Sequence, residues 1–310
     1  MLSQLVRLAV LLSAAVAVAP APAPAPVPAA AAPQPVLYRL DKASSLAEGC
    51  QAPCLCPVLF TDDLVGTMTV TFDHSTANWF DHYRVEDVNW IVGFGANERR
   101  VTGRGTYRVG GQLAVQQQLT LDLSFDGQAP VHYDSGLVLG GAGFPSIDVG
   151  IDLGTTGCFN SWISVSASPV PAGEIVRYHL RGSSYEEGCQ PPCLCPIFAT
   201  PADGSFGLVD LGPATDPNFQ HFALVKTTWK TDASFGGTPR VFKGFGTYSV
   251  DVLGIEHRLV CDMREAGQKV QRFDSGWASG GFAGAPMIDI DAAVNGFFCF
   301  DQVWRIVAVP

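Results

Sequence analysis

Apolar and polar residues alternate along much of the chain. In "QLTLDLSF" (118–125), Leu119, Leu121 and Leu123 share one face, and the residues between them are polar. The segments "VGTMTVTF" and "WISVSA" alternate in the same way. A period of two is typical of strands with one buried face. The pattern predicts eight or nine strands in each half of the chain, and no amphipathic helix longer than about two turns.

Short glycine-containing turns separate these segments. Gly-Gly at 110–111 and 140–141, and Asp-Gly at 126–127, are typical of hairpin connections. Short connections favour antiparallel neighbours. We therefore expect an all-β fold in which each half is an antiparallel meander, either a sandwich or a closed barrel.

The whole pattern occurs twice. "EGCQAPCLCPV" begins at Glu48, and "EGCQPPCLCPI" begins 139 residues later at Glu187. "GRGTYRV" from Gly103 matches "GFGTYSV" from Gly244. We expect two tandem copies of one domain, residues 36–168 and 169–310, which meet within the proline-rich "SASPVPAG". Some 140 residues is an ordinary size for a domain with its own core.

The first 35 residues differ from the rest. Residues 1–19 have one basic residue, Arg7, followed by a short apolar run, which predicts a signal peptide whose cleavage point could lie as late as residue 32. Residues 20–35, "PAPAPAPVPAAAAPQP", predict a semi-rigid spacer, because proline prevents helix and sheet pairing. No later run is long enough for a membrane span, so we expect no membrane insertion after signal removal.

Two local features refine the strands. The apolar parity changes between Val85 and Val88, and a similar change follows Leu224, which predicts a β-bulge in each copy. Two glycines on one strand face, Gly103 and Gly105, leave a bare strip of backbone. We expect an aromatic ring from a neighbouring strand to pack there, with a bound ligand as the alternative.

The chain has nine cysteines, and their arrangement indicates the redox environment in which the protein folds. Eight match between the copies, and an even set in each domain of a secreted chain predicts disulfides. Zinc or an iron–sulfur cluster is the alternative, although C-x3-C-x-C lacks the usual spacing of a zinc site. The eight matched residues are Cys50, Cys54, Cys56 and Cys158 in the first copy, and Cys189, Cys193, Cys195 and Cys299 in the second.

Every pairing within a copy connects the amino-terminal cysteines to the last strand, because Cys158 has no other partner there. Cys50–Cys54 with Cys56–Cys158 is weakly preferred over the other pairings. Cys261 has no counterpart and replaces Leu121 on an apolar face, which indicates a buried, inert thiol.

The matched histidines, His82 and His221, lie among aromatic residues, and we expect them on a strand surface or in packing. His257 aligns with Gln117 on the apolar-parity face. We interpret this polar position as a strand end near solvent, with an inward-facing position in a barrel as the alternative.

The matched acids are Asp134 and Asp148 in the first copy, and Asp274 and Asp289 in the second. Asp-Ser-Gly is typical of a turn in which the carboxylate accepts backbone N–H groups. A calcium site made by these residues is the less favoured alternative. None of the common catalytic motifs occurs, so we expect a protein that is not an enzyme and needs no cofactor.

The chain has a formal net charge of −10, which makes nucleic acid an unfavourable partner. A protein or polysaccharide partner remains open. The leading hypothesis is a non-catalytic binding or structural module that is secreted, whether extracellular, periplasmic or on the cell surface. A barrel that carries a small apolar ligand is the first alternative, and a secreted hydrolase is the second. The sequence identifies no ligand-binding residues.

Overall fold

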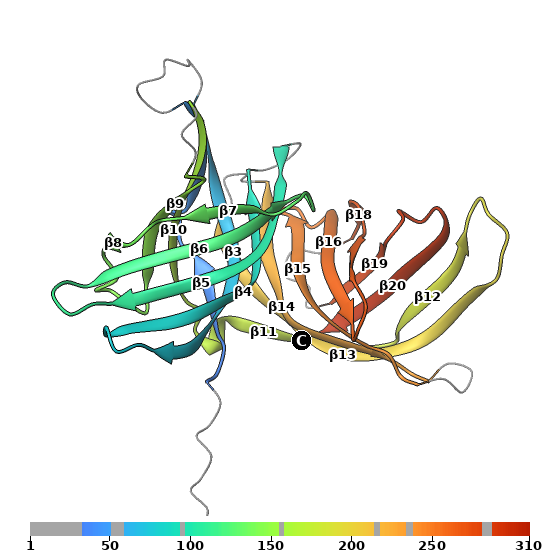
Figure 1. Cartoon of the computed structure of the whole chain (residues 1–310). Helices are drawn as coiled ribbons and strands as arrows, with labels where there is room; N and C mark the ends of the chain where they lie inside the picture. Colours follow the sequence, from blue (N-terminus) through green and yellow to red (C-terminus); the bar gives the residue numbers. More distant parts are fainter. Residues whose placement is uncertain are drawn as a thin grey trace, which may run out of the picture. The chain divides into compact units, whose positions relative to one another are not determined.

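A computed structural model describes residues 33–50, 59–93, 97–154, 158–213, 218–233, 238–280 and 287–310. The described chain forms two antiparallel sheets, with one short 3-10 helix, η2 (Ala172–Glu174), between them (Figure 1). The all-β prediction is therefore confirmed. No helix in the described residues is long and apolar enough to cross a membrane.

The first sheet lies within the first copy and has ten strands. They are β1 (Val36–Leu40), β2 (Ser45–Cys50), β3 (Leu59–Ser75), β4 (Phe80–Val92), β5 (Arg99–Gly110), β6 (Gln116–Phe125), β7 (Val131–Asp134), β8 (Val138–Leu139), β9 (Ile147–Asp152) and β10 (Phe159–Pro169).

The second sheet repeats this order. Its strands are β11 (Ile175–Leu180), β12 (Ser183–Gln190), β13 (Ile197–Pro213), β14 (Phe219–Thr231), β15 (Val241–Asp251), β16 (Glu256–Glu265), β17 (Val270–Asp274), β18 (Ala278–Ser279), β19 (Ile288–Ala293) and β20 (Cys299–Val309).

Each sheet closes on itself, so each is a barrel rather than a sandwich. In the first sheet, neighbours pair in turn from β2 to β7, β7 pairs with β9, and β10 pairs with both β9 and β2. Strands β1 and β2 share one position in the ring, because both lie between β3 and β10. Strands β7 and β8 both pair with β6. Each of these two pairs of strands takes the place of one longer strand. The ring therefore contains ten strands, although the sequence pattern predicts eight or nine.

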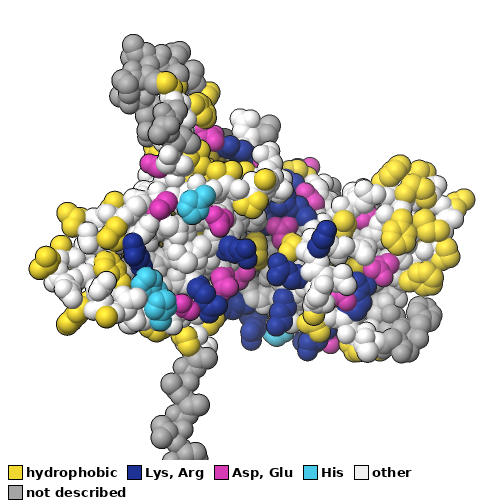
Figure 2. Space-filling view, viewed as in Figure 1, with side chains coloured by type: hydrophobic (Ala, Val, Ile, Leu, Met, Phe, Trp, Pro, Cys, Tyr) yellow, Lys and Arg dark blue, Asp and Glu magenta, His cyan; other side chains and the backbone are white. Residues whose placement is uncertain are grey.

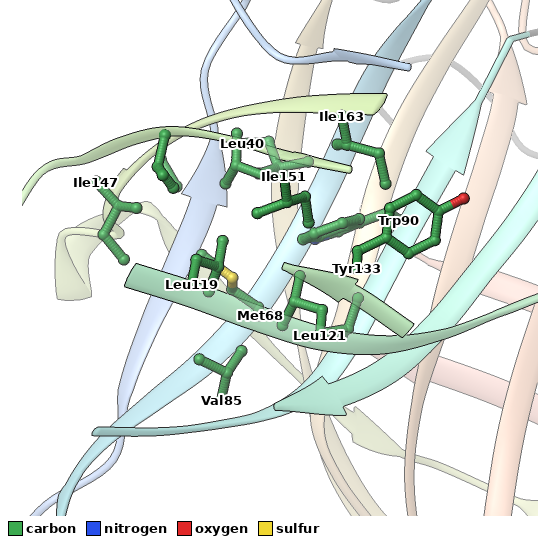
Figure 3. Close-up of a cluster of buried hydrophobic side chains, with 14 of the residues drawn as sticks. Leu40, Met68, Val85, Trp90, Leu119, Leu121, Tyr133, Ile147, Ile151 and Ile163 are labelled. Carbon is green, nitrogen blue, oxygen red and sulfur yellow. The ribbon is translucent and has the colours of Figure 1, made fainter. Parts of the chain in front are cut away.

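The inward faces of the strands form the core of each barrel. Along β6, Gln117, Leu119, Leu121 and Leu123 are buried in alternation, as the period of two predicts. In the first barrel these leucines meet side chains of other strands, including the fully buried Trp90 (Figure 3). Burying one such side chain is worth about 1.5–3 kcal/mol. The packed interior is therefore the main source of stability of each barrel.

The predicted bulges are confirmed. The register of β4 against β5 shifts between Val85 and Val88, and that of β14 against β15 shifts between Leu224 and Thr227. Asp87 and Lys226 lie inside the shifts with φ of 50° and 52°, the left-handed conformation that an extra residue in a strand often adopts.

The prediction for the paired glycines was wrong. A Cβ atom on Gly105 would lie 1.8 Å from the backbone oxygen of Thr120, and one on Gly103 would lie 2.3 Å from that of Asp122. The neighbour is therefore the backbone of β6, rather than an aromatic ring or a ligand. Glycine is needed because adjacent strands approach very closely at this point.

A third buried cluster joins the two barrels. It combines Ile91 of β4 with side chains of β13 and β14, and residues 33–310 form one compact unit. Whether residues 36–168 and 169–310 fold independently stays a prediction. The residues of the second copy in this cluster are Val209, Leu211, Ala223 and Val225.

Polar contacts cross the same boundary. Asn89 Nδ2 donates a hydrogen bond to the backbone oxygen of Gly246 at 2.6 Å. The buried guanidinium of Arg100 lies 3.5 Å from the buried carboxylate of Asp262 and donates to Asn89 Oδ1. Separating the barrels would leave the Arg100 guanidinium without its carboxylate partner, which disfavours other relative arrangements, whereas Asp262 would keep Arg272 of its own barrel at 2.9 Å.

Candidate functional site

Two loops of the first barrel border an open, shallow groove, which we call the loop-end groove. One loop joins β3 to β4 and the other joins β5 to β6. The groove has a volume of about 410 Å³. It is lined by Asn78, Phe80, Gly111, Gln112, Leu113, Ala114 and Gln116.

Glycines allow the two loops to approach each other. A Cβ atom on Gly110 would lie 1.9 Å from the backbone oxygen of Trp79, and one on Gly111 would lie 2.4 Å from that of Ala114. Both glycines have positive φ, and the N–H of Gly111 donates to Trp79 O at 3.1 Å. Only glycine fits this approach without strain, so the local sequence builds the groove wall.

A large aromatic side chain stands in the first of these loops. Trp79 is 73% exposed, whereas its neighbour Phe80 is half-buried. The guanidinium carbon of Arg108 lies 5.5 Å from the centre of the Phe80 ring. An exposed tryptophan is unusual here, because Trp90, Trp229 and Trp304 are fully buried.

The second barrel has an aromatic pair at the corresponding end. Phe219 begins β14, as Phe80 begins β4, and its ring centre lies 4.7 Å from that of Trp277. Trp277 is exposed and follows β17. Neither tryptophan was recognised from the sequence as a site residue. The available signals were the matched phenylalanines and the Gly-Gly pair.

The opposite end of each barrel has a matched ion pair. Arg99 Nη2 lies 2.8 Å from Glu48 Oε2 in the first copy, and Arg240 Nη1 lies 3.0 Å from Glu187 Oε1 in the second. Arg240 also lies over the rings of Tyr185 and Phe242, 5.0 Å from each centre. Glu48 and Glu187 are the first residues of the repeated cysteine segment.

This ion pair gives those glutamates a structural role. Arginine stacked on aromatic rings and bonded to a carboxylate is well suited to closing an apolar core. We therefore treat this end as part of the scaffold. This pair was not predicted from the sequence, although both partners match between the copies.

Disulfides lie next to this end in the second copy. Cys189 is bonded to Cys195, and Cys193 is bonded to Cys299. Applied to this copy, the preferred pairing would have joined Cys189 to Cys193. The preference was therefore wrong. The Cys193–Cys299 bridge nevertheless connects the cysteine cluster to the first residue of β20, across a sequence separation of 106.

In the first copy Cys50 and Cys158 each take part in a disulfide. Cys54 and Cys56 lie outside the described residues. Cysteines held in disulfides are not thiolates, so those in these bridges do not bind zinc or iron.

The remaining cysteine has no chemical role that the structure supports. Cys261 is fully buried, and burial raises the pKa of its thiol, with Asp262 acting in the same direction. A thiol that stays protonated is a poor nucleophile. The structure thus places Cys261 in the core, as its alignment with Leu121 predicts.

The four candidate calcium ligands are not brought together. Asp134 Oδ1 accepts the N–H of Gly136 at 2.8 Å, and Asp274 Oδ1 accepts that of Gly276 at 2.8 Å, which are the turns that Asp-Ser-Gly predicts. Asp148 and Asp289 are exposed on β9 and β19. Within the described residues, no group of three or more His, Cys, Asp or Glu side chains could hold a metal ion.

The matched histidines take part in packing. The His82 ring stacks on that of His74 with centres 4.6 Å apart. His221 is buried, and its Nδ1 lies 2.7 Å from Ser249 Oγ.

The interpretation of Gln117 and His257 as residues near solvent was wrong, because both are buried inside the barrels. Tyr107 donates to Gln117 Oε1 at 3.0 Å, and the hydroxyl of Tyr248 lies 3.0 Å from His257 Nδ1. Each polar side chain thus has a tyrosine partner on the adjacent strand, which lowers the cost of burying it.

Comparison with protein-family models, curated proteins and solved structures finds no match for this chain. Function is therefore inferred from the residues themselves. The loop-end groove of the first barrel and the Phe219–Trp277 pair of the second are the strongest candidates, because each exposes an aromatic side chain at the same end of its barrel.

Proposed function

We propose that the protein is a secreted, non-catalytic binding module that presents the loop ends of its two barrels to a ligand. Secretion is supported by the signal-like residues 1–19 and by the disulfides, which persist in oxidising compartments. The disulfides are consistent with an extracellular, periplasmic or cell-surface location alike.

The exposure of Trp79 beside the loop-end groove is the observation that supports binding most directly. Burying a large aromatic side chain is favourable, so a tryptophan that stays 73% exposed leaves free energy available for a ligand. The seven lining residues include no carboxylate, histidine, cysteine or hydroxyl side chain. A groove with an aromatic wall and no acid, base or nucleophile is suited to binding rather than to catalysis.

The two alternatives have less support. A carrier of a small apolar ligand needs an open interior, whereas the side chains of the first barrel point toward one another within it (Figure 3). A glycoside hydrolase needs two carboxylates on either side of its substrate. The groove lining supplies none.

The proposal predicts that the exposed tryptophans are needed for attachment. The double variant Trp79→Ala, Trp277→Ala should lose at least nine-tenths of the binding of the full-length protein to the envelope of the cells that produce it. Phe60→Ala is a matched control, because Phe60 is 62% exposed but lies on β3 near the cysteine cluster. Binding would be measured by sedimentation of labelled protein, and equal thermal unfolding would show that the variants are folded. Unchanged binding by the double variant would refute the proposal.

A further inference from the structure

We infer that the ligand of the loop-end groove is a neutral carbohydrate chain; this inference rests on the proposed function and specifies its ligand. The groove combines an aromatic surface with amide groups. Phe80 lines the groove, Trp79 is exposed next to it in the β3–β4 loop, and Asn78, Gln112 and Gln116 supply the amides. A sugar ring has an apolar face of C–H groups and an edge of hydroxyls, so it needs both kinds of contact.

The amides are free to serve a ligand. Asn78 and Gln112 are exposed and Gln116 is half-buried. None of the three side chains forms a hydrogen bond with another described residue. An amide has both a donor and an acceptor, which matches a hydroxyl group that needs both. Three unengaged amides around one groove therefore favour a ligand rich in hydroxyls.

The charge of the groove argues against other ligand classes. Its lining has no lysine or arginine, so a phosphate or carboxylate would find no charged partner there. Arg108 lies over the Phe80 ring, with which it makes a cation–π contact. The chain as a whole has a net charge of −10, which further disfavours an anionic ligand. A neutral polar ligand fits this environment best.

A peptide ligand is less well matched. Extended peptides usually bind along an open strand edge, where main-chain hydrogen bonds supply affinity. The groove is made from two loops, and the N–H of Gly111 in its wall already donates to Trp79 O of the β3–β4 loop. The ligand would therefore have to use side-chain contacts, which suits a sugar ring.

The second barrel supplies a second stacking surface, the Phe219–Trp277 pair. Because the two surfaces belong to different barrels, we expect each tryptophan to contribute separately to binding.

The inference predicts a direct response of tryptophan fluorescence to neutral oligosaccharides. Full-length protein would be titrated with hexamers of β-1,4-glucose, β-1,3-glucose, α-1,4-glucose and β-1,4-N-acetylglucosamine, with oligogalacturonate as the charged comparison. At least one neutral hexamer should shift the emission. In isothermal titration calorimetry, which does not depend on the removed fluorophore, Trp79→Ala should weaken its binding at least tenfold while Phe60→Ala leaves it unchanged. No response to any neutral hexamer, or stronger binding of oligogalacturonate, would overturn the inference.

A treatment of the envelope material separates this inference from the proposed function. A mixture of cellulase, β-1,3-glucanase, amylase and chitinase hydrolyses the four neutral chains named above, whereas a protease removes protein partners. Binding that the glycosidases abolish and the protease spares supports a carbohydrate ligand. Binding that only protease abolishes, and that still depends on the tryptophans, overturns the carbohydrate and retains the binding module. Binding that is unchanged when both tryptophans are replaced overturns both proposals.

Discussion

At the scale of single residues, the two barrels differ at a few inward positions whose environments are otherwise alike. Tyr107 pairs with Gln117 in the first, and Tyr248 pairs with His257 in the second. His257 Nε2 is buried without a hydrogen-bond partner among the described residues. The second barrel therefore contains a titratable group in its core at a position where the first has a neutral amide.

This difference predicts a pH effect at His257 in the second barrel. Burial lowers the pKa of His257, although Asp289 acts in the opposite direction. The unfolded chain, with a histidine pKa of about 6.5, then takes up a proton more readily than the folded chain. The contribution to stability is complete above about pH 6.5 and is lost as the pH falls through the range between the two pKa values.

His257→Gln would test this, since glutamine is the residue of the first barrel. Chemical denaturation at pH 8, 6.5 and 5 should show that the wild-type protein loses more stability toward acid than the variant does. His179→Gln is a control, because His179 is exposed on β11. Equal acid sensitivity of wild type and His257→Gln would contradict the argument.

At the scale of elements, the disulfides connect strands that are far apart in sequence. Cys193–Cys299 joins the segment between β12 and β13 to β20 over a separation of 106, whereas Cys189–Cys195 spans a separation of 6. In the chain-entropy model a bridge stabilises more when it closes a longer loop. The two bridges should therefore contribute unequally.

The unequal contribution can be measured. The double variant Cys193→Ser, Cys299→Ser should lower the free energy of unfolding of the second barrel by about 4.7 kcal/mol, and Cys189→Ser, Cys195→Ser by only about 2 kcal/mol. Guanidinium denaturation under non-reducing conditions would give both values. The idea fails if removing the long-range bridge costs no more than removing the short one.

At the scale of the whole molecule, the contact between the barrels depends on positions where the copies differ. The cluster uses Ala223 and Val225 of the second copy, and the matching residues of the first are Arg84 and Glu86. On the first barrel these charged residues would oppose an equivalent contact. Because of this difference, the two copies share one fold, but only the second copy offers an apolar surface at these positions for the contact between the barrels.

Exchanging these residues predicts uncoupled barrels. In Ala223→Arg, Val225→Glu, charges would enter the buried cluster, and the link at residues 170–174 should become more susceptible to protease. Arg84→Ala, Glu86→Val alters the matching face of the first barrel and is the control. Limited proteolysis and calorimetry would report the effect. Unchanged cleavage and a single shared transition in the Ala223→Arg, Val225→Glu variant would contradict this role of the cluster.

The candidate site was less accessible to sequence reasoning than the strands were. Trp79 and Gly111 are more than 30 residues apart, and nothing local indicates that their loops meet. The Gly-Gly pair predicted a turn, but not that its neighbour would be the β3–β4 loop. Gln117 lies on the inward face by parity, yet its burial depends on Tyr107 of the adjacent strand.

The sequence by itself determined the all-β class, the bulges and the set of matched cysteines. These depend on local periodicity and on the duplication, and both can be read directly from the order of residues in the chain. Only the tertiary structure decided the closure of each barrel, the Cys193–Cys299 pairing, the Arg240–Glu187 ion pair and the loop-end groove. Each of these joins residues that are distant in sequence, and their proximity follows from strand register, which alternation alone does not specify.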